Sequence, residues 1–598
     1  DSNMNSLLIT LGHGSSALFV YDKGSSVIGY EQERLSGIKA DSQFPKDAIN
    51  EIINNIGIHK MSDCNIYISH WFNDCTPDNK APQKVFESKY MTHTDYLNLL
   101  NISKKIIFVD KNFTHHDAHA WSAFSFFEQH LENTQIEPYS NRICTIVADG
   151  FGTNEEVLSI YESIKEDNKI SEPRLIKRVF GYDASIGLMY QYATSFCGMK
   201  ENQDEYKFLG YESHIDEYLS EESIDALDHL IEYNVTNLKK MFDAKSSPED
   251  GIWHASCDEE NIINFNKLSN VRKYWYTTFQ AVLENINFVS ENKETYDFIT
   301  RCIIAYFVQQ TVEIYFSQII HDYDMSNVIV AGGCFYNVKL NNRILESIPG
   351  LFCAMPLAGD QGAAIGMYRK FTSENFNFGN LLFGKRRMYN AEKAFSNKKG
   401  IYYFKVAENG LNKIATSIAN AISDGNLVNI IYGNMEFGPR ALCSTSTLFL
   451  PTKENVANNN HMNNRNEVMP CAPVCTQKNA EKLFGESIHR VVGSNRFMIC
   501  THEYEKPFSN QYAGVMHKKT LEDNIYTGRP QIVSEKEILI NMILNKVEAI
   551  CDAKCLVNTS FNVHGRPIVF DVKDILQNFE YQREHAVSGK EPLLFVIK

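Results

Sequence analysis

The sequence predicts an α/β fold in two domains, because apolar strands alternate with amphipathic helices along a chain too long for one core. At 598 residues the chain exceeds the length at which a single hydrophobic core stops growing. A glycine-punctuated, basic segment after Arg369 marks a change in composition. We therefore expect a first domain over residues 1–375 with a helical insertion at about 213–300, a linker at 376–400 and a second domain over 401–598.

The composition excludes several classes of protein. Hydrophobic residues make up 43% and charged residues 22% of the chain, as in ordinary globular proteins. The formal net charge of -15 disfavours nonspecific binding to nucleic acid through phosphates, although a nucleotide acceptor stays open. No apolar run approaches the roughly 20 residues that span a bilayer, so we expect no membrane partner. Fourteen cysteines without a paired framework indicate reduced thiols and a cytoplasmic location.

The first domain begins with a predicted hairpin, in which strands 7–11 and 17–21 flank the turn GHGSSA. A turn rich in glycine and serine offers backbone N–H groups and hydroxyls to an anion. The same arrangement recurs at 143–157, and between the two hairpins we expect a helix at 44–56 and a strand at 64–69.

A helix at 185–198 precedes the charged insertion, which we expect to be helical. The insertion could shape the acceptor side of a cleft or serve only as scaffold. Its aromatic residues could stack on a ring, but such spacing is more typical of a core. These residues are Trp253, Tyr274, Trp275 and Tyr276.

The end of the first domain predicts a nucleotide-binding turn. Apolar residues at helical spacing predict a long helix at 300–320, followed by a buried strand at 327–330. Two glycines end this strand and open the next helix, as in turns that hold a nucleotide phosphate, although a turn used only for packing is the alternative. The candidate residues are Gly332, Gly333, Asn337 and Asn341.

The second domain is expected to start with a helix at 410–424 and a strand at 427–432. Arg440 follows a Gly-Pro turn, Arg529 follows a glycine, and Asn558 ends a strand. Fork-shaped cations with an amide suit a small phosphorylated ligand, so we expect a shared anion pocket. The alternative for any single arginine is a surface ion pair.

Two histidines point to a metal site. His115 and His119 lie four residues apart and would share one face of a helix. Asp149 and Asp360 stand beside glycine-rich turns and could complete the ligand set. Imidazole with carboxylate suits Fe(II), Mn(II) or Zn(II) about equally. Ordinary hydrogen-bonded histidines in a helix are the alternative.

Taken together, these motifs resemble the O-carbamoyltransferase family, which includes the nodulation, cephem and tobramycin carbamoyltransferases. The resemblance runs from Leu7 to about Val569. Its motifs are GHGSSA at 12–17, HHDAHA at 115–120, EYKFLG at 205–210, the two glycines with Asn337, GDQGAA at 359–364, MEFGPRAL at 435–442 and NTSFNV at 558–563.

The resemblance implies a first domain like that of the sugar kinase, heat-shock and actin superfamily and a second domain of the YrdC type. It also implies two separate pockets. In the second domain, carbamoyl phosphate would be cleaved and carbamate would attack ATP to give carbamoyl adenylate. In the first, a hydroxyl of a small-molecule or nucleotide acceptor would take the carbamoyl group. The implied cofactors are ATP, Mg with ATP, and Fe(II) or another divalent metal; a homodimer stays open.

The resemblance also implies roles for individual residues. The expected catalytic residues are His13, Arg440 and Arg529, and carbamoyl phosphate would bind Arg440, Arg465, Arg529 and Asn558. The nucleotide would bind Gly150, Gly152, Lys207, Gly332, Gly333, Asn337 and Asn341. The metal ligands would be His115, His119, Asp149 and Asp360. His13 suits a base that takes the proton of the acceptor hydroxyl.

The chain departs from the family pattern at Thr445, where a second cation is usual, and at Arg566, where an acid is usual. One hypothesis is that Arg566 replaces the cation missing at Thr445. Two other functions stay open: a threonylcarbamoyl-transfer protein acting on tRNA, and a non-catalytic nucleotide-binding regulator. The fused second domain disfavours the former, and a complete metal set with Arg440 disfavours the latter.

Overall fold

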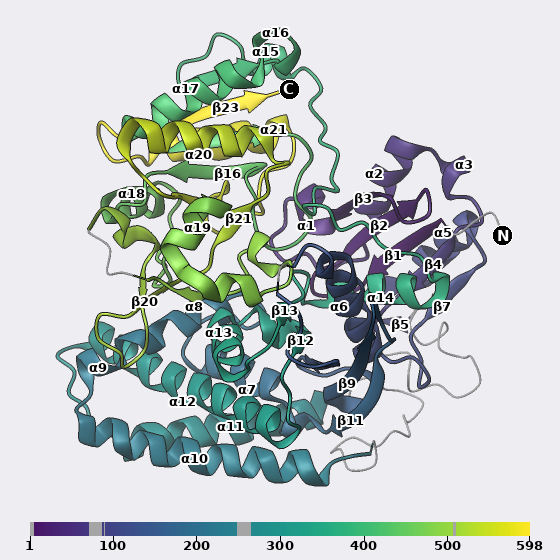
Figure 1. The fold of residues 1–598 in the computed structure, drawn as a ribbon, viewed down its shortest axis with the longest axis vertical. Helices are drawn as coiled ribbons and strands as arrows, with labels where there is room; N and C mark the ends of the chain where they lie inside the picture. The colour runs from purple at the N-terminus through teal and green to yellow at the C-terminus, as the bar shows by residue number, and fades with distance from the viewer. Residues whose placement is uncertain (1–4, 71–86, 89, 135, 248–264, 506–509) are drawn as a thin grey trace.

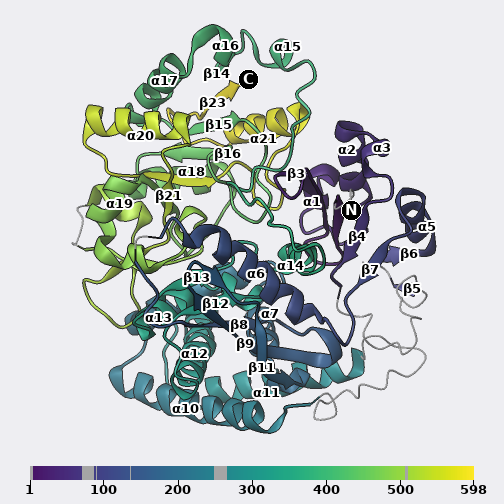
Figure 2. The same cartoon turned by 45° about the vertical axis from the view of Figure 1, so that its right-hand side comes forward.

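The computed structural model describes residues 5–70, 87–88, 90–134, 136–247, 265–505 and 510–598. Figures 1 and 2 show three lobes: an N-terminal one in purple, a helix-rich one in blue and teal, and a C-terminal one in green and yellow. The first two belong to the first half of the chain. Both halves are mixed α/β structures, as predicted.

The first half contains two sheets of similar design. In each, antiparallel strands joined by short turns are continued by two parallel strands. The first sheet has the order β3-β2-β1-β4-β7, from β1 (Ser6–Thr10), β2 (Ser16–Tyr21), β3 (Ser26–Glu31), β4 (Asn65–Ile68) and β7 (Ile106–Phe108). The second has the order β10-β9-β8-β12-β13 with β11 beside β9, from β8 (Arg142–Ala148), β9 (Glu156–Glu166), β10 (Lys169–Ile170), β11 (Arg174–Phe180), β12 (Val328–Ala331) and β13 (Phe352–Ala354). Both predicted hairpins are therefore confirmed.

Two helices pack against each other between these sheets. They are α6 (His115–Leu131) and α14 (Asp360–Thr372). A Cβ atom on Gly366 would lie 1.8 Å from the backbone oxygen of Ala118, so only glycine permits this approach. The contact fixes the N-terminal ends of both helices relative to each other.

The remaining helices of the first half confirm the predicted pattern. Helix α12 begins earlier than expected, because Asn292 caps its first turn by accepting from the N–H of Thr295. Trp275 is 1% exposed and belongs to the core, and Trp253 lies outside the described residues. The helices include α2 (Lys46–Ile56), α7 (Ile186–Phe196), α8 (Glu205–Phe208), α10 (Glu221–Ala244), α11 (Phe265–Asn285), α12 (Lys293–Asp322) and α13 (Val338–Ser347).

The second half is built on one seven-stranded sheet of order β14-β23-β15-β16-β22-β17-β21. Its strands are β14 (Ile401–Phe404), β15 (Val428–Tyr432), β16 (Thr445–Phe449), β17 (Ala472–Thr476), β21 (Gln531–Val533), β22 (Leu556–Ser560) and β23 (Leu593–Ile597). Its longer helices are α17 (Leu411–Ser423), α18 (Lys453–Met462), α19 (Gln477–Phe484), α20 (Ile538–Cys551) and α21 (Val572–Glu584). The helix and strand predicted at the start of this half are confirmed.

The two halves share hydrophobic packing. Val492, Phe497 and Met498 of the second half lie in one buried cluster with residues of α6 and α14. The N–H of Val492 also donates to the oxygen of Phe352 at 2.8 Å. Among the described helices, none has the length and apolarity to cross a membrane. The described cysteines are free thiols.

Gly332 and Gly333 offer a matched test of the turn after β12. Gly332 has a φ of +97°, and a Cβ there would lie 2.1 Å from the oxygen of Ala148, whereas a Cβ on Gly333 would meet nothing within 4 Å. We expect Gly332→Ala to destabilise the protein by roughly 2–4 kcal/mol and Gly333→Ala by less than about 1 kcal/mol. Thermal unfolding of both variants measures the difference; equal midpoints would contradict it.

Candidate functional site

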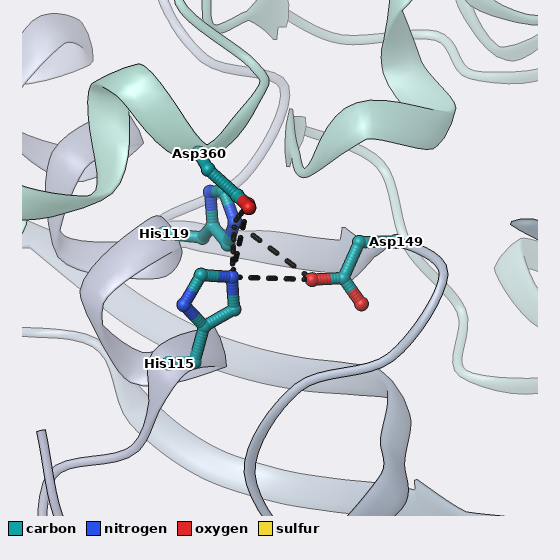
Figure 3. Close-up of side chains that lie close together, drawn as sticks. All are labelled: His115, His119, Asp149 and Asp360. Carbon is teal, nitrogen blue, oxygen red and sulfur yellow. Dashed lines mark hydrogen bonds and ion pairs between the residues drawn. The ribbon is translucent and has the colours of Figure 1, made fainter. Parts of the chain in front are cut away.

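The four predicted metal ligands converge. Their ligand atoms lie within 4.8 Å of one another, and Figure 3 shows the four side chains facing a common centre. The Nε2 atom of His115 lies 3.0 Å from Oδ1 of Asp360, 3.1 Å from Nε2 of His119 and 3.5 Å from Oδ2 of Asp149. The sequence prediction of one shared cluster therefore agrees with the geometry.

Local structure explains why these side chains meet. Thr114 and Asp117 form a capping box that begins α6, so His115 and His119 stand on its first turns. Asp149 directly follows β8, and Asp360 is the first residue of α14. The close packing of α6 against α14 brings the three elements together.

The surrounding contacts suit a divalent metal. Nδ1 of His115 donates to the oxygen of Ser69 at 2.7 Å, which directs Nε2 toward the centre. Nε2 of His116 lies 2.7 Å from Oδ1 of Asp149, while Oδ2 of Asp149 is buried without a hydrogen-bond partner in the described part of the chain. A two-imidazole, two-carboxylate set with an unsatisfied oxygen fits Fe(II), Mn(II) or Zn(II).

The electrostatics favour a positive charge at the centre. Burial raises the pKa of the Asp360 carboxyl, but the charge of His115 and its hydrogen bond outweigh this effect and hold that pKa well below its usual range. Burial lowers the pKa of His115, but Asp360 and then Asp149 raise it well above its usual value. The cluster therefore stabilises a bound cation, whether a proton or a metal ion.

Glu156 stabilises the first turn of α6 through hydrogen bonds. This carboxylate is fully buried and accepts the N–H of His116 at 2.9 Å. Arg178 pairs with Glu156 at 2.5 Å and with Asp117 at 3.0 Å. The sequence reasoning missed Glu156, Arg178 and the role of His116, although His116 stands inside the histidine motif.

A cavity of about 710 Å³ joins the two halves of the chain. It is lined by Asp149 and Asp360 from the four-residue cluster and by Arg440 and Arg529 from the second half. The expectation of two separate pockets is therefore corrected, because loops of both halves face one continuous space. Other predicted site residues that line it are His13, Gly150, Lys207, Gly333, Asn337, Arg465 and Asn558.

Three predicted nucleotide-binding residues are not among the lining residues: Gly152, Gly332 and Asn341. Gly332 allows the turn to approach β8, as described above. Asn341 is fully buried, and its amide nitrogen donates to the oxygens of Phe335 at 2.9 Å and Ile499 at 2.8 Å. It thus joins the two halves.

Asn337 lines the cavity, but its side-chain amide forms hydrogen bonds within the protein. Its Oδ1 accepts the N–H of Leu340 at 3.0 Å and so caps α13. Its amide also exchanges two hydrogen bonds with Gln309, of 2.7 and 3.0 Å. The side chain therefore shapes the turn, and the adjacent Gly333 is open to a ligand.

The arginines of the second half differ in their contacts. Nη1 of Arg465 donates to Thr559 at 3.0 Å, and its Nη2 donates to the oxygens of Ser560 and Asn562 at 3.0 and 2.6 Å. Arg440 and Arg529 instead stack on the ring of Tyr206. Arg465 therefore holds the end of β22, while the other two guanidinium groups form no hydrogen bond with the residues that the structure describes.

Asn558 presents an acceptor. Its Nδ2 donates to Oε1 of Gln531 at 2.6 Å and to the oxygen of Ala441 at 3.1 Å. Its Oδ1 is buried and has no partner among the described residues. A ligand with an N–H₂ group would satisfy this oxygen.

The hypothesis that Arg566 replaces a cation at Thr445 does not match the geometry. Arg566 is exposed, lies 5.5 Å over the ring of Tyr581 and is not among the cavity-lining residues. Thr445 is buried, and its hydroxyl donates to Glu436 at 2.7 Å. Arg386 from the linker, rather than Arg566, contacts the hydroxyl of Thr445.

Lys207 reaches the second half. Its Nζ lies 3.3 Å from Nδ1 of His564 and 3.7 Å from Oε1 of Glu467. Burial, and then the charge of Lys207, lower the pKa of His564, so its neutral ring accepts from the ammonium group. Sequence reasoning did not single out Glu467 or His564, because their partner lies some 260 to 360 positions away.

Comparison with known proteins identifies relatives over most of the chain. The family described as carbamoyltransferase N-terminus matches residues 8–368, and that described as carbamoyltransferase C-terminus matches residues 419–590. An uncharacterized protein of Methanocaldococcus jannaschii is 25% identical over 582 residues, which cover 95% of each chain. The nodulation protein NolNO of Sinorhizobium fredii is 23% identical over 609 residues, covering 95% of this chain and 77% of the relative.

Two solved structures align with parts of this chain. Component A of the (R)-2-hydroxyglutaryl-CoA dehydratase of Acidaminococcus fermentans is 9% identical and covers 62% of this chain and 98% of that protein, with a TM-score of 0.28. A Sua5 protein of P. abyssi is 13% identical and covers 33% of this chain and 48% of that protein, with a TM-score of 0.20.

The four-residue cluster leads to a prediction about metal binding. We expect His119→Ala to lower the affinity for a divalent metal more than about 100-fold, because it removes one of four donors. His116→Ala should lower it about 10- to 100-fold, because His116 orients Asp149 without facing the centre. Metal content after dialysis, measured by elemental analysis across a series of free-metal concentrations, gives both affinities.

The control is His130→Gln on the same helix. His130 is buried, but its Nδ1 donates to the oxygen of Phe126, away from the cluster. This variant should bind metal as the unchanged protein does. The assignment of the cluster fails if all three variants lose metal equally, or if none does.

Proposed function

The chain belongs to the carbamoyltransferase family, and from this we propose an ATP-dependent O-carbamoyltransferase that uses carbamoyl phosphate. Its acceptor would be a hydroxyl of a small molecule or nucleotide. The observation that carries the proposal is that Arg440 and Arg529 line the same cavity as the two carboxylates of the four-residue cluster. A donor activated at the arginines could reach these carboxylates without leaving the protein.

On the donor side, Arg440 and Arg529 would bind the phosphate of carbamoyl phosphate through their free N–H groups. Oδ1 of Asn558 would accept a hydrogen bond from the carbamoyl N–H₂ group. Water would cleave carbamoyl phosphate to carbamate and phosphate. A carbamate oxygen would then attack the α-phosphorus of ATP, with pyrophosphate as the leaving group and carbamoyl adenylate as the product.

The nucleotide would lie along the first half of the chain. Gly150 and Gly333 line the cavity, and nothing lies within 4 Å of the position that a Cβ on Gly333 would take. A phosphate could therefore approach the backbone there. Lys207 lines the same space and would face the nucleotide from the junction of the halves; Mg would accompany ATP.

Transfer would take place beside the metal cluster. His115, His119, Asp149 and Asp360 would hold Fe(II) or another divalent cation, which would supply Lewis-acid polarisation of a carbonyl or phosphate oxygen. The acceptor hydroxyl would attack the carbamoyl carbon, and AMP would leave. His13, exposed on the β1–β2 turn and lining the cavity, would take the proton of the hydroxyl.

The pathway predicts acceptor-independent pyrophosphate release. With ATP and carbamoyl phosphate alone, we expect slow pyrophosphate release, and an acceptor should accelerate turnover. Arg440→Ala and Arg529→Ala should each lower kcat/KM for carbamoyl phosphate at least about 30-fold, because each removes a half-buried cationic partner of the phosphate. An enzyme-coupled pyrophosphate assay measures these values.

Arg566→Ala is the matched control. Arg566 lies outside the cavity lining, so this variant should keep kcat/KM within about twofold. Pyrophosphate release that requires threonine and bicarbonate would instead favour threonylcarbamoyl transfer to tRNA. Nucleotide binding without any turnover would favour the regulator.

A further inference from the structure

The first half of the chain supplies one aromatic ring to the anion pocket of the second half. The guanidinium carbon of Arg440 lies 4.3 Å from the centroid of the Tyr206 ring, and that of Arg529 lies 4.9 Å from it. Tyr206 belongs to α8, more than 200 residues before either arginine. All three residues line the shared cavity.

Both guanidinium groups lie over this ring and line the shared cavity. Within the part of the chain that the structure describes, neither forms an ion pair or hydrogen bond, and Nε and Nη1 of Arg529 are buried without a partner. Burial, and then the charge of Arg529, lower the pKa of Arg440. Two like charges in one cavity repel each other, so an attractive contact that leaves their N–H groups free stabilises the pair.

The ring provides that interaction without using the N–H groups. A guanidinium stacked on an aromatic face is attracted by the negative face of the ring, and its planar N–H edge stays free for an oxyanion. Arg465 shows the contrast, because its N–H groups are taken up by Thr559, Ser560 and Asn562. The stacked pair is therefore arranged for a ligand of two negative charges.

Helix α8 is anchored at this place by its neighbours. Lys207 contacts His564 and Glu467 of the second half. Gly210 packs so tightly on Met469 that a Cβ there would lie 2.8 Å from Cγ of that side chain. The ring position is therefore set by contacts on both sides of the junction.

We propose that Tyr206 is a positioning residue that completes the anion site of the second half. Its ring orients Arg440 and Arg529 so that both guanidinium groups bind one phosphate dianion. The donor site therefore forms only where the two halves meet. The identity of the natural ligand, a phosphorylated carbamoyl donor, rests on the proposed function. The positioning role itself requires only a phosphate.

The test uses inorganic phosphate and the full chain, without ATP or carbamoyl phosphate. We expect Tyr206→Phe to bind phosphate within about threefold of the unchanged protein, because phenylalanine keeps the ring face. Tyr206→Leu should bind at least about tenfold more weakly, because both cation–π contacts are lost. Isothermal titration calorimetry gives the dissociation constants. Tyr206→Met, which keeps length and apolarity without a ring, serves if the leucine variant does not fold.

Two further variants separate positioning from general damage. Tyr211→Phe changes a buried tyrosine of the same segment, whose hydroxyl contacts Arg301 and which does not line the cavity, and should leave phosphate binding unchanged. In an Arg440→Ala/Arg529→Ala background, Tyr206→Leu should weaken any residual binding less than about twofold. Thermal unfolding checks that each variant is folded.

The proposal is overturned if Tyr206→Leu and Tyr206→Met bind phosphate as the unchanged protein does, or if Tyr206→Phe binds phosphate as weakly as Tyr206→Leu. It is also overturned if Tyr206→Leu still weakens phosphate binding at least about tenfold when both arginines are replaced by alanine. Failure of the proposed function is a separate outcome. In that case ATP with carbamoyl phosphate would release no pyrophosphate. The affinity for inorganic phosphate would still depend on an aromatic ring at position 206.

Discussion

The close crossing of α6 and α14 is the constraint on which the site depends. Gly366 has no side chain, so the backbone of Ala118 can lie against it, and the N-terminal turns of the two helices meet. Asp360 thereby comes within 3.0 Å of His115. Helix N-termini carry partial positive charge, which stabilises an adjacent carboxylate such as Asp360. The cluster is thus a consequence of helix packing between two sheets.

The second organising feature is the junction of the two halves. Arg34 of the first half is buried and donates to the oxygen of Gly438 at 2.7 Å, two residues before Arg440. Glu436 accepts the N–H groups of Leu442, Ser444 and Thr445, which follow Arg440. The loop that carries Arg440 is therefore held from both halves. An acidic chain can in this way present half-buried cations to an anionic ligand.

Much of the fold and the convergence of the four candidate metal ligands could be predicted from the sequence. The hairpins around residues 12–17 and 149–155, the long helix α12 and the pairing of His115 with His119 all follow from patterns of period two or 3.6 within short stretches. Asp149 and Asp360 were found because they stand beside glycine-rich turns. These signals are local, and secondary structure follows local pattern.

Long-range contacts could not be predicted. Asn341 and Gly332 look like ligand-binding residues in sequence, but tertiary packing uses them to join the halves and to bring a turn close to β8. Arg465 and Arg440 look alike in sequence, yet Arg465 donates its N–H groups at the end of β22 whereas Arg440 lies over the ring of Tyr206, because the fold decides hydrogen-bond partners. Local patterns along the chain are sufficient to predict its helices and strands and the residue types available for chemistry. Packing of the two halves is needed to place both candidate pockets on one cavity and Tyr206 against two arginines, because side chains hundreds of residues apart meet only after the halves have packed.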